Sequence, residues 1–212
     1  MPLQNRVDPF GQIHAVPARG LFTGNRGSIH DPETKTLLKR RWTTKAWIIC
    51  DCGFQGRKRE VFGRNTRGGG PGWTNLFFLD EVTALAAGHR PCFECRREKA
   101  KGFADCFGKA FGIAKSRVIE MDNRLHAERL AVAGNVSREV DRAIIAQLPD
   151  GAMIAVSGKP YALRHGRTLA WSFDGYSEGT AAAELTAASL VTPPTIIAVL
   201  QAGYQPVWKD VT

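Results

Sequence analysis

The chain of 212 residues contains no apolar run approaching the roughly 18 residues that a membrane-spanning helix requires, so we expect no transmembrane segment. Its first residues, MPLQNRVDPFGQIHAV, lack the apolar stretch of a secretory signal, and we therefore expect a cytoplasmic protein. Internal repeats and low-complexity tracts are missing as well. Hydrophobic residues make up 43% and charged residues 23%, which is typical of a soluble globular protein.

Acidic residues are scarce relative to basic ones. The chain has 20 Asp and Glu against 29 Lys and Arg, which gives a net charge of +9. All of the excess lies in residues 1–110, with 19 basic and 10 acidic residues, whereas residues 111–212 have 10 of each. A polyanion such as nucleic acid is the natural partner of such a surface. The alternative is a solvated basic face that only aids solubility.

Cysteines are few, and four of the five occur in close pairs. In a cytosolic chain such pairs are metal ligands or redox groups more often than disulfides. Cys92 and Cys95 are two residues apart at the start of a predicted helix, and Cys50 and Cys52 follow a predicted strand. Four thiolates form the closed tetrahedral site of structural zinc, so we predict a Zn²⁺ ion on these four residues.

Other interpretations of the cysteines remain open. A histidine such as His89 can replace one of the four ligands, most readily Cys52, because a Cys-x-Cys pair is less usual than Cys-x-x-Cys. A redox pair normally follows a strand in a thioredoxin-like unit, and that context is missing here. The fifth cysteine, Cys106, is interpreted as a buried thiol of the helix core.

The pattern of apolar residues and turn formers predicts an α+β fold. Residues 46–50 and 57–62 are expected to form a hairpin and residues 76–79 a short strand. A helix capped by Asp80 should end at Gly88, and a second should run over 94–111. We expect a basic zinc module over residues 1–110, and over 111–212 a helical segment, a small β-meander and a terminal helix.

The segment FFLDEVTALAAGHRPCFECRR, residues 77–97, resembles the zinc-binding domain of Ada-type DNA repair proteins. In that family an acidic or Asn cap, an EALAAGFRPC-like helix and turn, and a CxxC pair follow one another without gaps. Cys50, preceded by two isoleucines, resembles the first cysteine of the family, which ends a strand. The resemblance implies a four-cysteine zinc site in a small α/β, Ada-like module that binds DNA, in repair or regulation.

The family's first cysteine accepts a methyl group from a DNA phosphotriester, a role that would fall on Cys50. The spacing of Cys50 and Cys52 departs from the family's Cys-x-x-x-Cys, however, and the chain has no PCHR motif and no evident AraC-like helix-turn-helix. The resemblance therefore extends to zinc and DNA but not to methyl transfer. As a whole, the 212-residue layout resembles an uncharacterised bacterial protein group.

Seven basic residues of the first half are candidate phosphate contacts. Two belong to a turn-rich segment that includes Gly-Asn-Arg-Gly, and five lie on and after the predicted hairpin, where aromatic residues are interleaved. The alternative is ordinary loop chemistry and a solvated face. The seven candidates are Arg19, Arg26, Arg57, Lys58, Arg59, Arg64 and Arg67.

Acid–base groups suggest a second function. Asp122, His126 and Arg129 recur at i, i+4 and i+7, so they should share one helix face, either as a catalytic set or as a salt-bridge ladder. If His14 and His30 converge with Asp122 and His126, the chain is an enzyme acting on nucleic acid or a phosphate compound. A third hypothesis is a zinc-stabilised interaction module with no nucleic-acid partner.

Overall fold

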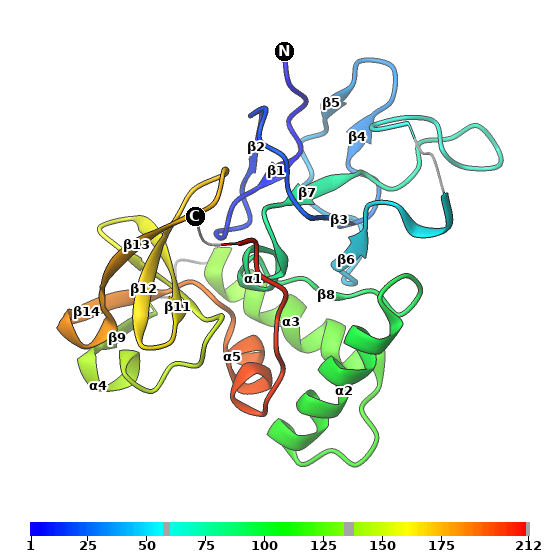
Figure 1. Cartoon of the computed structure of the whole chain (residues 1–212). Helices are drawn as coiled ribbons and strands as arrows, with labels where there is room; N and C mark the ends of the chain where they lie inside the picture. The colour runs from blue at the N-terminus through cyan, green and yellow to red at the C-terminus, as the bar shows by residue number, and fades with distance from the viewer. Residues whose placement is uncertain (57–59, 134–137, 211–212) are drawn as a thin grey trace.

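The computed structural model describes residues 1–56, 60–133 and 138–210, and within them two six-stranded sheets lie side by side (Figure 1). The first sheet has the strand order β2-β1-β7-β3-β6-β8, and the second has the order β13-β12-β11-β10-β14-β9. The first comprises β1 (Arg6–Val7), β2 (Ile13–His14), β3 (Phe22–Asn25), β6 (Ile48–Asp51), β7 (Leu76–Phe78) and β8 (Arg90–Pro91). The second comprises β9 (Glu139–Asp141), β10 (Met153–Val156), β11 (Lys159–Arg164), β12 (Arg167–Trp171), β13 (Tyr176–Ala181) and β14 (Ala187–Leu190).

Helices cover one side of the first sheet and one end of the second (Figure 1). They are α1 (Glu81–Ala86), α2 (Arg97–Phe111), α3 (Val118–Ala133), α4 (Arg142–Ile145) and α5 (Pro194–Gln201). A small hairpin, β4 (His30–Asp31) with β5 (Thr36–Leu37), and the short 3₁₀ helices η1 (Phe54–Gly56) and η2 (Ala182–Glu184) complete the described elements. In these ranges no helix combines the length and apolar character that crossing a bilayer demands. The predicted α+β class is confirmed, and the predicted meander corresponds to β10, β11 and β12, to which β13 adds a fourth antiparallel strand.

The main hydrophobic core combines residues from both halves of the chain. It packs Ile49 and Phe78 of the first sheet against Phe103 of α2, Leu125 of α3 and Val199 of α5. A second cluster joins Val82 of α1 to the face of β10 to β12. The boundary expected at residue 110 therefore does not follow the packing, because α3 and α5 complete the core that the first sheet begins.

In the described residues of 46–62, the expected second strand of the hairpin is absent. Of its second strand, residues 57–59 lie outside the described part of the chain, and residues 60–62 are not in a strand. Instead β6 pairs antiparallel with β3 and parallel with β8. These partners are distant in sequence, so local turn signals could not indicate them.

Hydrogen bonds at both ends of α1 fix where the helix begins and where the chain enters β8. Asp80 caps the helix by accepting a hydrogen bond from the backbone N–H of Thr83 at 2.9 Å. At the other end Gly88 has φ of +80°, and its N–H donates to Leu85 O while that of His89 donates to Ala84 O. The chain thereby turns directly into β8, which carries Cys92 toward β6.

We expect Gly88→Ala to lower the free energy of unfolding by about 1–2 kcal/mol, the cost of a left-handed backbone for a residue with a Cβ. An added Cβ would also meet Cδ of Arg129 at 3.1 Å. The matched control is Gly102→Ala inside α2, where an added Cβ has open space and alanine should stabilise by about 0.5–1 kcal/mol. Chemical denaturation measures both, and equal effects of the two substitutions would contradict this account.

Candidate metal centre

Three cysteines from two parts of the chain meet where β6 and β8 end. The two strands run parallel, with Ile48 opposite Arg90 and Ile49 opposite Pro91, and the N–H of Cys92 donates to Ile49 O at 2.9 Å. Cys50 and Cys92 therefore leave neighbouring strands at the same end. Cys95 follows after a turn in which the N–H of Arg96 donates to Cys92 O at 3.0 Å.

The sulfur atoms of Cys50, Cys92 and Cys95 all lie within 4.8 Å of one another. Tetrahedral zinc–thiolate bonds of about 2.3 Å place sulfurs about 3.8 Å apart, so this cluster has the size that one ion requires. The N–H of Glu94 points at the Cys92 sulfur, at 3.4 Å. The 15-residue helix α2 begins directly after this turn, and its N-terminus favours negative charge on the sulfurs.

The protonation of the three thiols fits a cation as well. The pKa of Cys92 lies far below the usual thiol value, because Cys50 and then Cys95 hydrogen bond to its sulfur. The pKa of Cys50 is raised, first by its hydrogen bonds with Cys92 and Cys95 and then by burial. Three sulfurs at this distance cannot all ionise on their own, whereas a thiophilic cation binds all three as thiolates and releases their protons. These residues can therefore hold a metal ion.

Cys52 is not part of this cluster, in contrast to the four-cysteine prediction. Strand β6 ends at Asp51 and the chain turns, so the alternation that would keep Cys50 and Cys52 on one face stops. The exposed Cys52 thiol donates to Leu21 O at 3.5 Å. His89 does not replace it: its ring is buried between Trp47 and Phe78. Cys106 is a buried thiol of α2, as predicted, and donates to Ala202 O.

A cavity of about 350 Å³ opens over the cluster. All three cysteines line it, together with Asp51, Cys52, Trp73 and Asn75 among others. A tetrahedral ion on three sulfurs has one further position, which this cavity makes accessible from solvent.

The geometry of three clustered thiols recurs in unrelated folds, so it does not by itself assign the chain to a family. No family model, curated protein or solved structure matches this chain. The resemblance of residues 77–97 to the Ada-type zinc domain therefore stays a prediction.

The candidate phosphate contacts fall into three groups. Arg19 and Arg67 are exposed, and Arg64 is exposed but paired with Glu33 at 2.6 Å. Arg26 does not fit the prediction of a surface contact, because only 2% of it is exposed and its guanidinium stacks over Trp47 at 4.0 Å. The remaining candidates, Arg57, Lys58 and Arg59, lie outside the described residues.

The four acid–base candidates do not meet in one site. His14 pairs with Asp8 at 2.7 Å, and the buried His30 hydrogen bonds Thr74 through Nδ1 at 2.7 Å. Asp122 accepts two hydrogen bonds of 2.8 Å from Arg90, so it does not orient His126. The enzyme hypothesis built on these four groups loses its geometric basis, and the His126 ring instead packs edge-on against Trp42.

Sequence reasoning missed a buried ion pair beside the metal cluster. Arg96 follows Cys95 directly and donates to both carboxylate oxygens of Glu81, at 2.9 and 3.2 Å. The Glu81 carboxylate also accepts from the Tyr204 hydroxyl at 2.6 Å and from the N–H of Val207 at 2.8 Å. The sequence feature that could have indicated this ion pair is Glu81, the acidic first residue of the otherwise uncharged helix EVTALA.

Proposed function

We propose that this chain is a zinc protein that binds nucleic acid, with DNA the expected partner. Zinc is structural in this proposal: on Cys50, Cys92 and Cys95, with a fourth donor such as water from the cavity, it would fix β6 against the start of α2. The observation that carries the proposal is the cluster of three sulfurs within 4.8 Å in the half of the chain that holds all of the excess positive charge.

The donor set favours zinc among the metals of the cell. Thiolates are soft ligands that select zinc, copper(I) and iron–sulfur clusters over magnesium or calcium. Two of the three ligands are the CxxC pair at a helix N-terminus, a spacing typical of structural zinc sites. The site is mononuclear in size, since the sulfurs lie too close together to surround a cluster of several irons.

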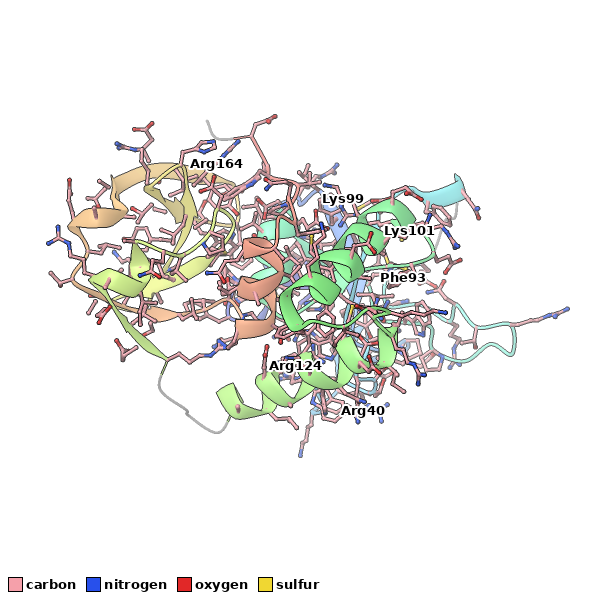
Figure 2. All side chains as sticks on the ribbon, turned by 90° about the horizontal axis from the view of Figure 1, so that it is seen from below. Arg40, Phe93, Lys99, Lys101, Arg124 and Arg164 are labelled. Atoms are coloured by element: carbon pink, nitrogen blue, oxygen red, sulfur yellow. The ribbon has the colours of Figure 1, made fainter. Side chains whose placement is uncertain are left out.

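An exposed basic segment, residues 39–45, supports the nucleic-acid part of the proposal. It presents Lys39, Arg40, Arg41 and Lys45 around Trp42, whose relative exposure is 40%. No ion pair in the described part of the chain neutralises residues 39–41. Cations beside an accessible aromatic ring are what a nucleic-acid strand needs, because the cations contact phosphates and the ring stacks on a base. In Figure 2 Arg40 projects beside the helical side of the molecule, well separated from Arg164 on the second sheet.

The double variant Lys39→Gln/Arg40→Gln should bind DNA more weakly, and its plot of log K against log salt should be shallower by about two, one for each lost phosphate contact. Fluorescence anisotropy with a labelled duplex and a labelled single strand, between about 50 and 200 mM salt, measures both quantities. The matched control is Arg142→Gln/Arg167→Gln, which removes the same charge from exposed sites of the second half.

Equal loss of affinity in the control would mean that only net charge matters, and the basic segment would lose its role. If the wild-type protein binds neither the duplex nor the single strand at the lowest salt concentration, the proposal fails. The zinc-stabilised interaction module then becomes the better description of the chain.

A further inference from the structure

A second cavity, of about 470 Å³, lies between the β1–β2 turn, the basic segment and α3. It shares no lining residue with the cavity over the cysteines. Its walls contain three arginines, a histidine and two tryptophans, and no carboxylate among the described residues that line it. These six residues are Arg26, Arg41, Arg129, His126, Trp42 and Trp47.

Arg26 is the centre of this cavity's chemistry. Its guanidinium is buried, donates through Nη1 to Gly11 O at 2.8 Å, and approaches Nε2 of His89 through Nε at 3.3 Å. Its other nitrogen, Nη2, has no hydrogen-bond partner within the described residues. A buried guanidinium N–H without an acceptor is costly, and Arg26 lines the cavity, so after a small side-chain movement an anion in the cavity would supply the acceptor that Nη2 lacks.

Two further donors of the same wall have unused hydrogen-bonding capacity. Arg129 donates to Gly88 O at 2.7 Å and to Lys45 O at 2.8 Å, yet its Nε has no partner in the described ranges. The same is true of Nδ1 of His126. The guanidiniums of Arg26 and Arg129 lie 4.0 and 4.2 Å from the Trp47 ring centroid, so one ring supports both cations.

The nearby carboxylates are engaged elsewhere. Asp8 is the acid whose charge raises the pKa of Arg26, and it accepts hydrogen bonds from His14 at 2.7 Å and from the N–H of Gln12 at 2.9 Å. Asp122 is held by Arg90. Glu128 accepts from the N–H and the hydroxyl of Thr195, at 3.1 and 2.5 Å. These carboxylates therefore offset the positive charge of the cavity only in part, because they act on Arg26 and Arg129 through their charge and hydrogen bond to other groups.

Burial makes the positive charge of both arginines costly. Burial, and then the neighbouring Arg129, lower the pKa of Arg26 to about 9. Burial also lowers the pKa of Arg129 to about 10. An anion bound between these groups would relieve both effects, since it supplies the opposite charge that the site lacks.

We propose that this cavity binds a phosphate group, carried either by a free phosphomonoester such as a nucleotide or by a nucleic-acid strand. Arg26 Nη2, Arg41 and His126 would donate to its oxygens from different directions, as a tetrahedral anion with several acceptors requires. The cavity has room for an organic group beside the phosphate, and Trp42 at its rim offers a stacking face for a base. If the phosphate belongs to a nucleic-acid strand, the inference rests on the proposed function. If it belongs to a free nucleotide, the inference is independent of that function.

The first test uses inorganic phosphate and thermal unfolding, with chloride at equal ionic strength as the reference. We expect phosphate to raise the Tm of the wild-type protein by several degrees, because a ligand that binds only the folded state stabilises it. In Arg26→Met this shift should shrink to the small general effect that phosphate has on any protein. Without phosphate, Arg26→Met should be at least as stable as the wild type, since it removes an unbalanced buried charge.

Arg142→Gln, an exposed arginine on α4, is the control and should keep the full shift. Equal phosphate-dependent shifts in the wild type and in Arg26→Met would overturn the proposal. Should Arg26→Met fail to fold, Arg41→Gln at the exposed rim replaces it, with an expected loss of phosphate affinity of about tenfold, the effect of one charged hydrogen bond. An unchanged affinity in Arg41→Gln would then count against the site.

The second test distinguishes the two sources of the phosphate. If the site takes a phosphomonoester, adenosine 5′-monophosphate should bind, a 5′-phosphorylated oligonucleotide should bind at least about tenfold tighter than its 5′-hydroxyl form, and Arg26→Met should abolish that difference. If it takes an internal strand phosphate, both oligonucleotides should bind equally and lose the same factor in Arg26→Met. Indifference of all three ligands to Arg26→Met would refute the site. A protein that binds the nucleotide but no oligonucleotide would disprove the proposed function and leave this inference standing.

Discussion

Cys92→Ser is expected to remove zinc from the protein and to unfold or strongly loosen the first sheet. Cys92 joins the two parts of the cluster, since its backbone N–H bonds Ile49 O and its sulfur lies within 4.8 Å of those of Cys50 and Cys95. Structural zinc contributes about 10–16 kcal/mol to the folding of small zinc peptides, which exceeds the total stability of about 5–15 kcal/mol of most domains. Even a fraction of that contribution would decide whether β6 stays paired with β8.

Metal analysis of the purified variants measures the first part of this result, and thermal unfolding measures the second. The wild type and Cys52→Ser should each retain about one zinc per chain, because the Cys52 sulfur points to Leu21 O rather than into the cluster. Cys106→Ser is a second control, because it changes a buried thiol of α2 that lies outside the cluster. If Cys52→Ser loses zinc as completely as Cys92→Ser, the site has four cysteine ligands and β6 must continue beyond Asp51 when metal binds.

The features that the sequence predicted well are those encoded within a few residues. The Asp80 cap, the turn at Gly88 and the Cys92–Cys95 pair depend on neighbours in the chain, so short-range rules identify them. The predicted meander was recovered for the same reason, because its strands are successive and joined by turns.

The features that the sequence did not predict depend on partners far away in the chain. The sequence groups Cys52 with Cys50 because the two form a close pair, and the end of β6 at Asp51 separates their side chains. Arg26 is predicted to contact phosphate because it lies in a turn-rich basic segment, yet its guanidinium stacks over Trp47 and hydrogen bonds Gly11 O. In both cases tertiary packing, which no local window contains, decided where the side chain points.

Glu81→Gln should lower the free energy of unfolding by about 3 kcal/mol, because it leaves the charge of Arg96 buried without its main partner. The two side chains are 0% and 4% exposed, and the carboxylate accepts four hydrogen bonds, two of them from Arg96. The loss falls toward the lower end of the 3–5 kcal/mol typical of broken buried pairs, since Asp51 lies 3.3 Å from Arg96 and retains part of the compensation. Chemical denaturation monitored by tryptophan fluorescence measures it.

A double-mutant cycle with Arg96→Met separates the ion pair from simple loss of packing. If the pair is coupled, Glu81→Gln/Arg96→Met should be more stable than the sum of the single effects predicts, by about 1–3 kcal/mol, because the double variant leaves neither charge unpaired. The cycle also connects the pair to the metal. Arg96 follows Cys95 and links the start of α2 to α1 and, through Glu81, to Tyr204, so Glu81→Gln should weaken zinc retention in competition with a chelator. Strictly additive single effects, with unchanged zinc retention, would show that this ion pair neither stabilises the fold as a unit nor positions the cysteines.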